Sequence, residues 1–200
     1  LAEIEASHDG TSDDEKGDLI FRTNDGSDGT SPTERLRIDS NGSILTATLG
    51  TDNVHLGEGA GDSIASGGNN NVVIGKDAGT ALTTGDNNVA VGFEALKTED
   101  ADGNNVAIGY QALKTLNAGA SGENVAVGYK SLTSQTTGAS NVAVGYLAGE
   151  DLTTGTDNTF IGTEAGKNTT DRNHNTAIGN QTLFTNVNGA KNVAVGSGAL

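Results

Sequence analysis

Asn124-Val125-Ala126-Val127-Gly128 is one of nine copies of a motif that decides the fold of this 200-residue chain. Each copy has an asparagine, three mostly apolar residues and a glycine, and successive motif glycines lie 17 to 19 residues apart. A small residue follows three positions after each glycine, the next residue is Leu or Gly, and the rest of each unit is polar and turn-rich. Self-similarity at a fixed period is the signature of repeat architectures, so the chain from residue 51 onward is predicted to be a repeat array.

The period and the composition of the motif together predict an all-β fold. Seventeen residues are too few for the helix pairs of the common helical repeats, and Val-Ala-Val followed by Gly is β-rich. One unit suits one coil of a β-solenoid or β-roll. We therefore expect nine coils of about 17 residues over 51–200, a segment truncated at its C-terminal end, making a rod roughly 40 Å long at about 4.8 Å per coil.

The three consecutive apolar residues of each motif predict partners. Neighbouring residues on a strand point to opposite faces, so Val89 and Val91 face one way and Ala90 the other. One face can line the interior of the coil, and continuous apolar runs are typical of strands that are covered on both sides. The expected partner is another copy of the chain, in an intertwined or parallel homotrimer.

Two columns of motif residues are the candidate structural sites. The asparagines are expected to stack at one corner and bond to backbone groups and to one another, with a ligand-binding role as the alternative; they are Asn53, Asn71, Asn88, Asn105, Asn124, Asn141, Asn158, Asn175 and Asn192. The glycines are expected to permit a tight corner or a positive φ; they are Gly57, Gly75, Gly92, Gly109, Gly128, Gly145, Gly162, Gly179 and Gly196.

The first fifty residues differ from the repeats. Residues 1–17 are dominated by Asp, Glu, Ser and Gly, which predicts a polar connecting segment without regular structure. Leu19 and Phe21 then alternate with Ile20 and Arg22, Leu36 and Ile38 alternate with charged residues, and a short strand-like run follows at 44–46. This pattern predicts a small β-module over 18–50 that acts as a cap or adaptor for the solenoid.

The module and the repeats carry a family resemblance. The stretches 17–23, GDLIFRT, and 33–42, TERLRIDSNG, resemble a module of bacteriophage tail-fibre proteins, often ones that end in a self-cleaving chaperone. The Asn-Val-Ala-Val-Gly-Tyr units are similar to repeats in such fibres and, more loosely, to head repeats of trimeric autotransporter adhesins. The resemblance implies a homotrimeric fibre segment of the virion tail, with other tail proteins and a host receptor or glycan as partners, or alternatively an adhesin on a bacterial surface.

Composition excludes several other functions. The chain has 11 Lys and Arg against 26 Asp and Glu, a net charge of −15, which argues against binding to a nucleic-acid backbone. The absence of Cys excludes disulfides and thiolate metal sites. No run approaches the roughly 18 apolar residues of a membrane span, so no membrane insertion is expected.

An aromatic residue follows the motif glycine in four successive coils, at Phe93, Tyr110, Tyr129 and Tyr146. This stripe is interpreted either as rings stacked on one another, which join the coils, or as a platform for a glycan.

No catalytic or cofactor site is predicted. The acidic run 24–29 makes structural Ca²⁺ conceivable, but position 26 is Gly, and Arg35 stands where a calcium loop requires Glu. His8, His55 and His174 lie far apart in the chain, and the two in solenoid positions, His55 and His174, are expected roughly 30 Å from each other, too far to share a metal. A polysaccharide depolymerase would need two carboxylates at a suitable separation, and the acidic residues carry no distinctive pocket signature; they include Glu94, Glu99, Asp100, Asp102, Glu150, Asp151 and Glu164.

Overall fold

The computed structural model describes residues 2–8, 17–23, 33–38, 44–46, 52–117, 119, 122–186 and 189–200. The chain divides into two compact units, Leu1–Thr48 and Leu49–Leu200, which we call the module and the solenoid. In the described part of the chain every regular element is a β-strand, so the predicted all-β class is confirmed.

The module is a four-stranded antiparallel sheet in the order β1-β2-β3-β4. Its strands are β1 (Ala2–His8), β2 (Gly17–Thr23), β3 (Thr33–Ile38) and β4 (Ile44–Thr46). Strands β2 and β3 contain the alternating stretches 19–22 and 36–38, and β4 coincides with the short run at 44–46. The expectation of an unstructured connection over 1–17 is wrong for residues 2–8, because β1 pairs along its whole length with β2.

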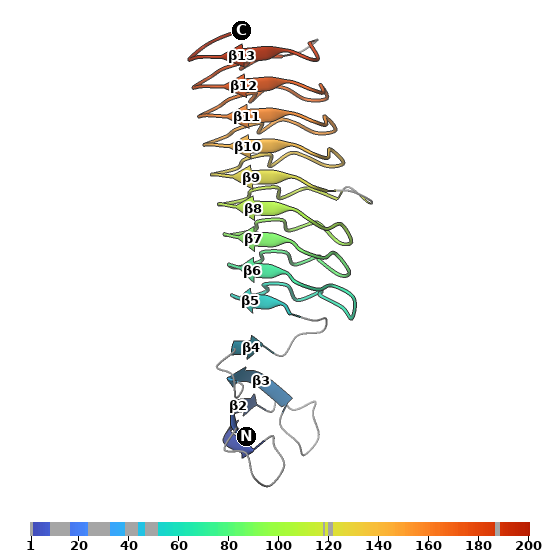
Figure 1. The fold of residues 1–200 in the computed structure, drawn as a ribbon, viewed down its shortest axis with the longest axis vertical. Coiled ribbons are helices and arrows are strands. Elements are labelled where there is room, and N and C mark those ends of the chain that lie inside the picture. Colours follow the sequence, from blue (N-terminus) through green and yellow to red (C-terminus); the bar gives the residue numbers. More distant parts are fainter. Residues whose placement is uncertain are drawn as a thin grey trace. The chain divides into compact units, whose positions relative to one another are not determined.

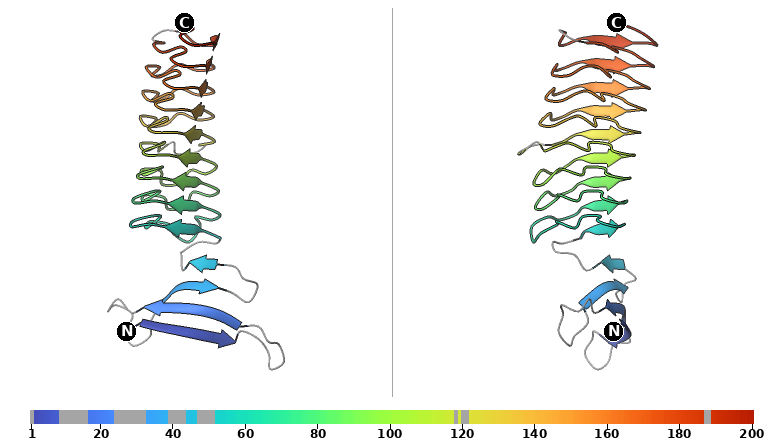
Figure 2. Two further views of the ribbon diagram at one scale, coloured as in Figure 1. Left: turned by 90° about the vertical axis from the view of Figure 1, so that its left-hand side faces the viewer. Right: turned by 180° about the vertical axis from the view of Figure 1, so that it is seen from behind.

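The solenoid is a single nine-stranded parallel sheet in which each coil contributes one strand (Figures 1 and 2). Consecutive strands pair in register, so equivalent motif positions lie directly above one another; Val125, for example, pairs with Val142. The predicted β-solenoid is therefore confirmed. The strands are β5 (Val54–Leu56), β6 (Val72–Ile74), β7 (Val89–Val91), β8 (Val106–Ile108), β9 (Val125–Val127), β10 (Val142–Val144), β11 (Thr159–Ile161), β12 (Thr176–Ile178) and β13 (Val193–Val195).

The solenoid core is built from columns of small and large apolar side chains. The middle residue of nearly every strand is buried, as at Ala107, Ala126 and Phe160. Ala112 and Leu113, three and four positions after the motif glycine of their coil, are also fully buried. These side chains form one continuous hydrophobic cluster along the stack.

The corners of the coil require unusual backbone dihedral angles. All nine motif glycines have φ between +117° and +143°, a region that side chains other than glycine rarely adopt. A Cβ on Gly75 would also lie 2.6 Å from the carbonyl oxygen of Gly92 in the next coil. Glycine is therefore needed both for the turn and for the close approach of neighbouring coils.

Candidate functional site

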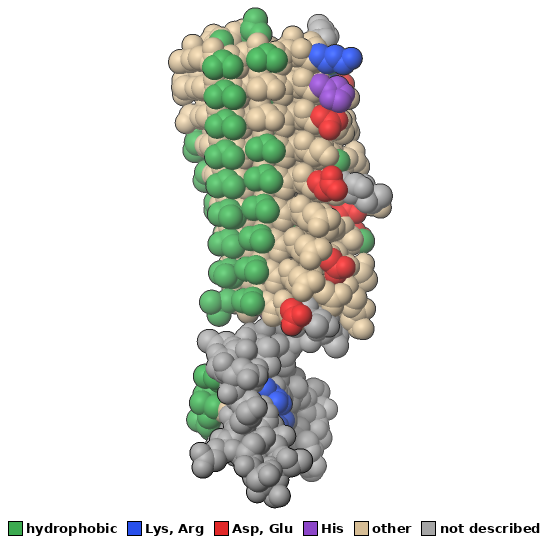
Figure 3. All heavy atoms as spheres, viewed as in Figure 1, with side chains coloured by type: hydrophobic (Ala, Val, Ile, Leu, Met, Phe, Trp, Pro, Cys, Tyr) green, Lys and Arg blue, Asp and Glu red, His purple; other side chains and the backbone are tan. Residues whose placement is uncertain are grey.

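The outward face of the solenoid sheet is a regular apolar surface that runs along all nine coils. The first and third residues of each strand point away from the core, and they form columns of hydrophobic side chains along the stack (Figure 3). Even in the middle of the stack these side chains stay partly open, with Ile108 39% and Ile161 39% exposed. Two threonines, Thr159 and Thr176, interrupt the first-position column, whereas the third-position column is aliphatic in all nine coils.

The nine motif asparagines form a column of hydrogen bonds through the solenoid. The backbone N–H of Asn141 donates to Oδ1 of Asn124 at 3.0 Å, and the N–H of Asn158 donates to Oδ1 of Asn141 at 3.0 Å. The amide group of Asn141 also donates to the carbonyl oxygen of Gly155 at 2.8 Å, in the loop that follows. The column thus ties each coil to the next and to the polar loops, and these contacts occupy the asparagine side chains.

The aromatic stripe consists of near-parallel stacked rings. The ring centroids of Phe93 and Tyr110 are 5.2 Å apart, those of Tyr110 and Tyr129 are 5.1 Å apart, and those of Tyr129 and Tyr146 are 5.3 Å apart. The interplanar angles of 8–15° mean that each inner ring has a neighbour on both faces. A sugar stacks on an aromatic face, so this geometry favours ring-on-ring stacking over the glycan platform. The edges of the rings remain open, from 37% exposure at Phe93 to 51% at Tyr146.

A group of charged side chains beside the aromatic stripe was missed in the sequence. Glu94 accepts hydrogen bonds from Lys97 at 2.6 Å and Gln111 at 2.7 Å, and its second ion pair, with Lys114, is also 2.6 Å long. The hydrogen bonds from Lys114 and Lys97 lower the pKa of Glu94 to about 2. Since Gln111 and Lys114 belong to the next coil, the carboxylate joins two coils. The 17-residue offset between Glu94 and Gln111 is the signal that could have revealed it.

Glu99, like Glu94, has a structural role. Oε1 of the buried Glu99 accepts the backbone N–H groups of Asp100 at 3.1 Å and Asp102 at 2.9 Å. Glu99 occupies a core position where other coils have leucine, such as Leu82 and Leu152. Glu99 therefore stabilises the loop that follows it.

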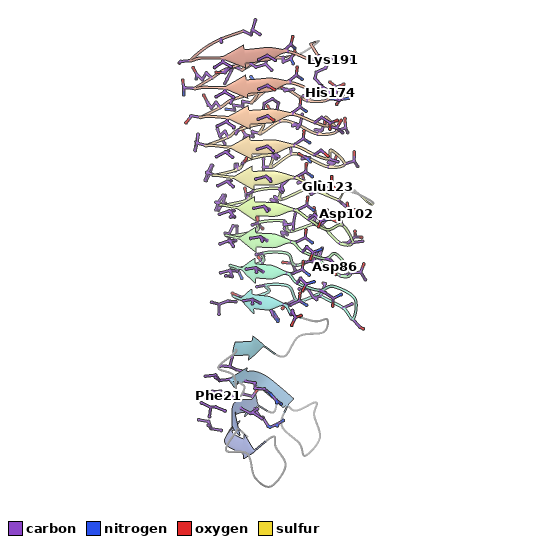
Figure 4. The ribbon with its side chains drawn as sticks, viewed as in Figure 1. Phe21, Asp86, Asp102, Glu123, His174 and Lys191 are labelled. Carbon is purple, nitrogen blue, oxygen red and sulfur yellow. The ribbon has the colours of Figure 1, made fainter. Side chains whose placement is uncertain are left out.

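Some further charged residues line the loop side of the stack. Asp86, Glu123, His174 and Lys191 lie along this side (Figure 4). Oδ1 of Asp86 accepts the backbone N–H of Asn69 in the preceding coil at 2.7 Å. His174 lies 3.7 Å from Asp157, measured between Nδ1 and Oδ2.

Metal binding and membrane insertion find no support in the described residues. These contain no group of three or more His, Cys, Asp or Glu side chains that could hold a metal ion. The acidic run at 24–29, the conceivable Ca²⁺ loop, lies outside the described residues. A search of the same part of the chain for a helix able to span a membrane finds none.

These features define the class of the chain as a β-solenoid repeat protein with a small antiparallel β-module. No protein-family model, curated protein or solved structure matches the chain.

Proposed function

We propose that this chain is a structural segment of an elongated homo-oligomeric fibre, in which copies pack side by side through the outward face of the solenoid sheet. The observation that supports the proposal is the pair of hydrophobic columns on that face, which a soluble single chain has no physical reason to maintain over nine coils. Large exposed apolar patches mark interaction sites. The other flanks of the coil carry ion pairs, ring stacks and polar loops.

The bacteriophage tail fibre is the setting we favour. The chain would form part of a trimeric shaft in the virion tail that joins other tail proteins to a distal, receptor-binding region. The resemblance of residues 17–23 and 33–42 to a tail-fibre module supports this setting over a bacterial surface adhesin. The proposal assigns no catalytic step. A polysaccharide depolymerase is a weaker alternative because Glu94 and Glu99 already have structural partners.

The test is the solution mass of the full chain, measured by light scattering after size-exclusion chromatography, for the natural sequence and two variants. Val127→Asp places a charge in the third-position column. Ser140→Asp is the matched control, because the same repeat position already holds aspartate at Asp52 and Asp157.

We expect a mass near three times 20.1 kDa for the natural chain and for Ser140→Asp, and a lower mass for Val127→Asp. A folded monomer of the natural sequence, or an unchanged oligomer in Val127→Asp, would refute packing through this face.

A further inference from the structure

The outward face of the solenoid is bounded by two edges of different chemistry. The exit edge consists of the two residues after each motif glycine, and it carries the aromatic stripe and, in the coil of β9, Lys130. The entry edge consists of the residue two positions before each strand, which is polar in all nine coils. In Figure 4 Glu123, His174 and Lys191 of the entry edge lie on the side where the strands begin, and the strands run toward the opposite side.

The two hydrophobic columns of this face are too narrow to hold copies together without the edges. First- and third-position residues lie about 7 Å apart, and nine coils at about 4.8 Å each give a strip of on the order of 300 Å². A stable interface needs roughly 800 Å² per partner. The seven residues from entry edge to exit edge, 123–129 in the coil of β9, widen the strip to about 20 Å and its area to on the order of 800 Å². Packing through the outward face therefore has to include both edges.

The coil of β9 carries one unpaired charge on each edge. Four of the six solenoid lysines form ion pairs between described residues, as Lys114 does with Glu94 at 2.6 Å. Lys130 instead lies beside the aromatic stripe, with Nζ 5.7 Å from the ring centroid of Tyr129. The exposed side chain of Glu123 forms no ion pair within the part of the chain that the structure describes. Each of these two charges is thus available to a partner.

Cyclic symmetry brings the two edges together. In a closed ring of parallel copies, a rotation without a shift relates each copy to the next, so the exit edge of one copy meets the entry edge of its neighbour at the same level. This geometry is the same for three copies as for any other number. In the coil of β9 it places Lys130 of each copy against Glu123 of the next.

We infer that the copies pack in parallel and in register, with Lys130 of one copy paired with Glu123 of the next. The inference rests on the proposed function, because it needs copies that lie side by side, and it adds the residues and the orientation of their contact. Complementary charges across an interface fix the register and exclude wrong arrangements. The partner is therefore a second copy of this chain, recognised by the opposite edge of the same face.

The tyrosines of the exit edge fit the same contact. Tyr110, Tyr129 and Tyr146 are 41%, 42% and 51% exposed in the single chain. At their levels the entry edge of the next copy presents Asn104, Glu123 and Ser140. Each of these side chains has an oxygen that can accept a hydrogen bond from a tyrosine hydroxyl group.

The charges favour parallel over antiparallel packing. Strand β9 is the middle strand of the nine. In a centred antiparallel pair of faces, each edge would meet its own copy, so Lys130 would face Lys130 and Glu123 would face Glu123. Like charges that meet across an interface destabilise it.

The acidic residues elsewhere on the edges are compatible with the parallel arrangement. In the coil of β5, Asp52 would meet Glu58, which is already paired with a lysine of its own copy at 2.7 Å. In the coil of β11, Asp157 would meet Glu164, which is paired with a lysine of its own copy at 3.2 Å. These contacts therefore bring an acidic residue against an ion pair and not against a lone charge.

The test exchanges the two charges in the full chain. The variants are Lys130→Glu, Glu123→Lys and the double variant, and light scattering over a dilution series gives the protein concentration at which each is half assembled. Both substitutions suit the fold, since Glu94 and Glu164 occupy the repeat position of Lys130 and Lys191 occupies that of Glu123. All of these positions have the same left-handed backbone, with φ of 52–62°.

We expect each single variant to need about tenfold more protein for half assembly, because weakening three contacts about fivefold each raises the dissociation constant of a trimer about a hundredfold. The double variant should return to within about threefold of the natural chain. The single variants change the net charge in opposite directions, so a general effect of net charge cannot weaken both. Single variants that assemble like the natural chain, or a double variant that assembles no better than either single variant, would overturn the inference.

Failure of the proposed function has a different signature. A natural chain that is monomeric at every concentration refutes packing through the outward face and the edge contact together. An oligomer that Val127→Asp dissociates, but that the charge exchange does not restore, refutes the edge contact alone. Restoration by the charge exchange, together with an unaffected Val127→Asp oligomer, supports the edge contact and refutes packing through the hydrophobic columns.

Discussion

Replacing Asn141 by alanine tests whether the asparagine column holds neighbouring coils together. The substitution removes Oδ1, which accepts the backbone N–H of Asn158 at 3.0 Å, and Nδ2, which donates to the carbonyl oxygen of Gly155 at 2.8 Å. Both of these backbone groups belong to buried residues. Leaving a buried donor or acceptor unsatisfied costs about 1–3 kcal/mol, so two such groups should lower the free energy of unfolding by about 2–6 kcal/mol.

The matched control is Asn192→Ala in the last coil. The N–H and side-chain amide of Asn192 both donate to Oδ1 of Asn175, at 3.1 and 3.0 Å, and Oδ1 of Asn175 keeps the backbone donor after the substitution. In the described part of the chain no hydrogen bond is donated to the side chain of Asn192. This variant should cost about 1 kcal/mol or less, the net value of one hydrogen bond.

Guanidinium unfolding at one fixed protein concentration measures the difference. With a denaturant dependence of about 4 kcal/mol per M, Asn141→Ala should move the midpoint down by about 0.5–1.5 M without a change in slope. If Asn141→Ala and Asn192→Ala shift the midpoint equally, the column contributes no coupling between coils and the reasoning fails.

Two further substitutions test the corner and the ion pairs. Gly92→Ala should destabilise the solenoid by about 1–3 kcal/mol more than Gly196→Ala in the same unfolding assay; both positions have positive φ, but only the Cβ on Gly92 would meet a neighbouring coil, 2.5 Å from the oxygen of Gly109. The depressed pKa of Glu94, about 2 against 4.5, stabilises the fold above pH 4.5, and this contribution disappears as the pH falls from 4.5 to 2. The stability difference between the natural chain and Glu94→Gln should therefore shrink over that range, and a difference that does not change with pH would show that the ion pairs add nothing.

The strand positions of the solenoid could be predicted because the repeat is regular and its residue types are specific. Val-Ala-Val alternates large and small side chains with the period of a strand, and the glycine after it marks the corner. Nine copies in one register remove the ambiguity that a single tripeptide would leave. The structure follows this prediction coil by coil, from Val54 to Val195.

Strand β1 could not be predicted from the sequence of residues 1–17, for a physical reason. Strand β1 contains Glu3, Glu5, Ser7 and His8, and its composition alone is that of a polar loop. Only the position of Ile4 between the two glutamates indicates one apolar and one polar face. Pairing with β2 supplies the remaining stability, and that contact is not encoded in local composition.

The left-handed conformation of several leucines could not be predicted from the sequence either. Leu96, Leu113 and Leu132 have φ of 50–51°, although leucine rarely adopts this conformation. Their side chains are fully buried. Core packing therefore stabilises a backbone conformation that local preference opposes, and no propensity argument could have located it.

The choice between leucine and glycine at this left-handed position follows the size of the strand's middle residue. Coils with alanine in the strand, such as Ala107 and Ala126, have leucine at this position, whereas His55, Val73 and Phe160 are followed by Gly61, Gly79 and Gly166. The structure gives the reason, since a Cβ on Gly166 would lie 2.5 Å from Cδ1 of Phe160. The coil that contains Ala143 is the exception, because it has Gly149 at the left-handed position. A Cβ on Gly149 would lie 2.8 Å from the ring of Phe160, which belongs to the next coil. The side chains at the middle of the strand and at the left-handed position therefore compete for the same core volume.

This shared volume predicts a strong coupling between Phe160 and Gly166. Phe160→Ala should cost about 3–5 kcal/mol through the cavity it leaves, and Gly166→Leu should cost at least about 1–3 kcal/mol through overpacking. The double variant recreates the alanine-and-leucine pair of the next coil, Ala177 and Leu183, in which leucine already adopts the required φ. Unfolding of the four proteins should show the double variant to be more stable than the sum of the single effects by about 1–3 kcal/mol. Additive effects would mean that the two side chains do not compete for space, and the rule that relates the strand residue to the corner residue would be wrong.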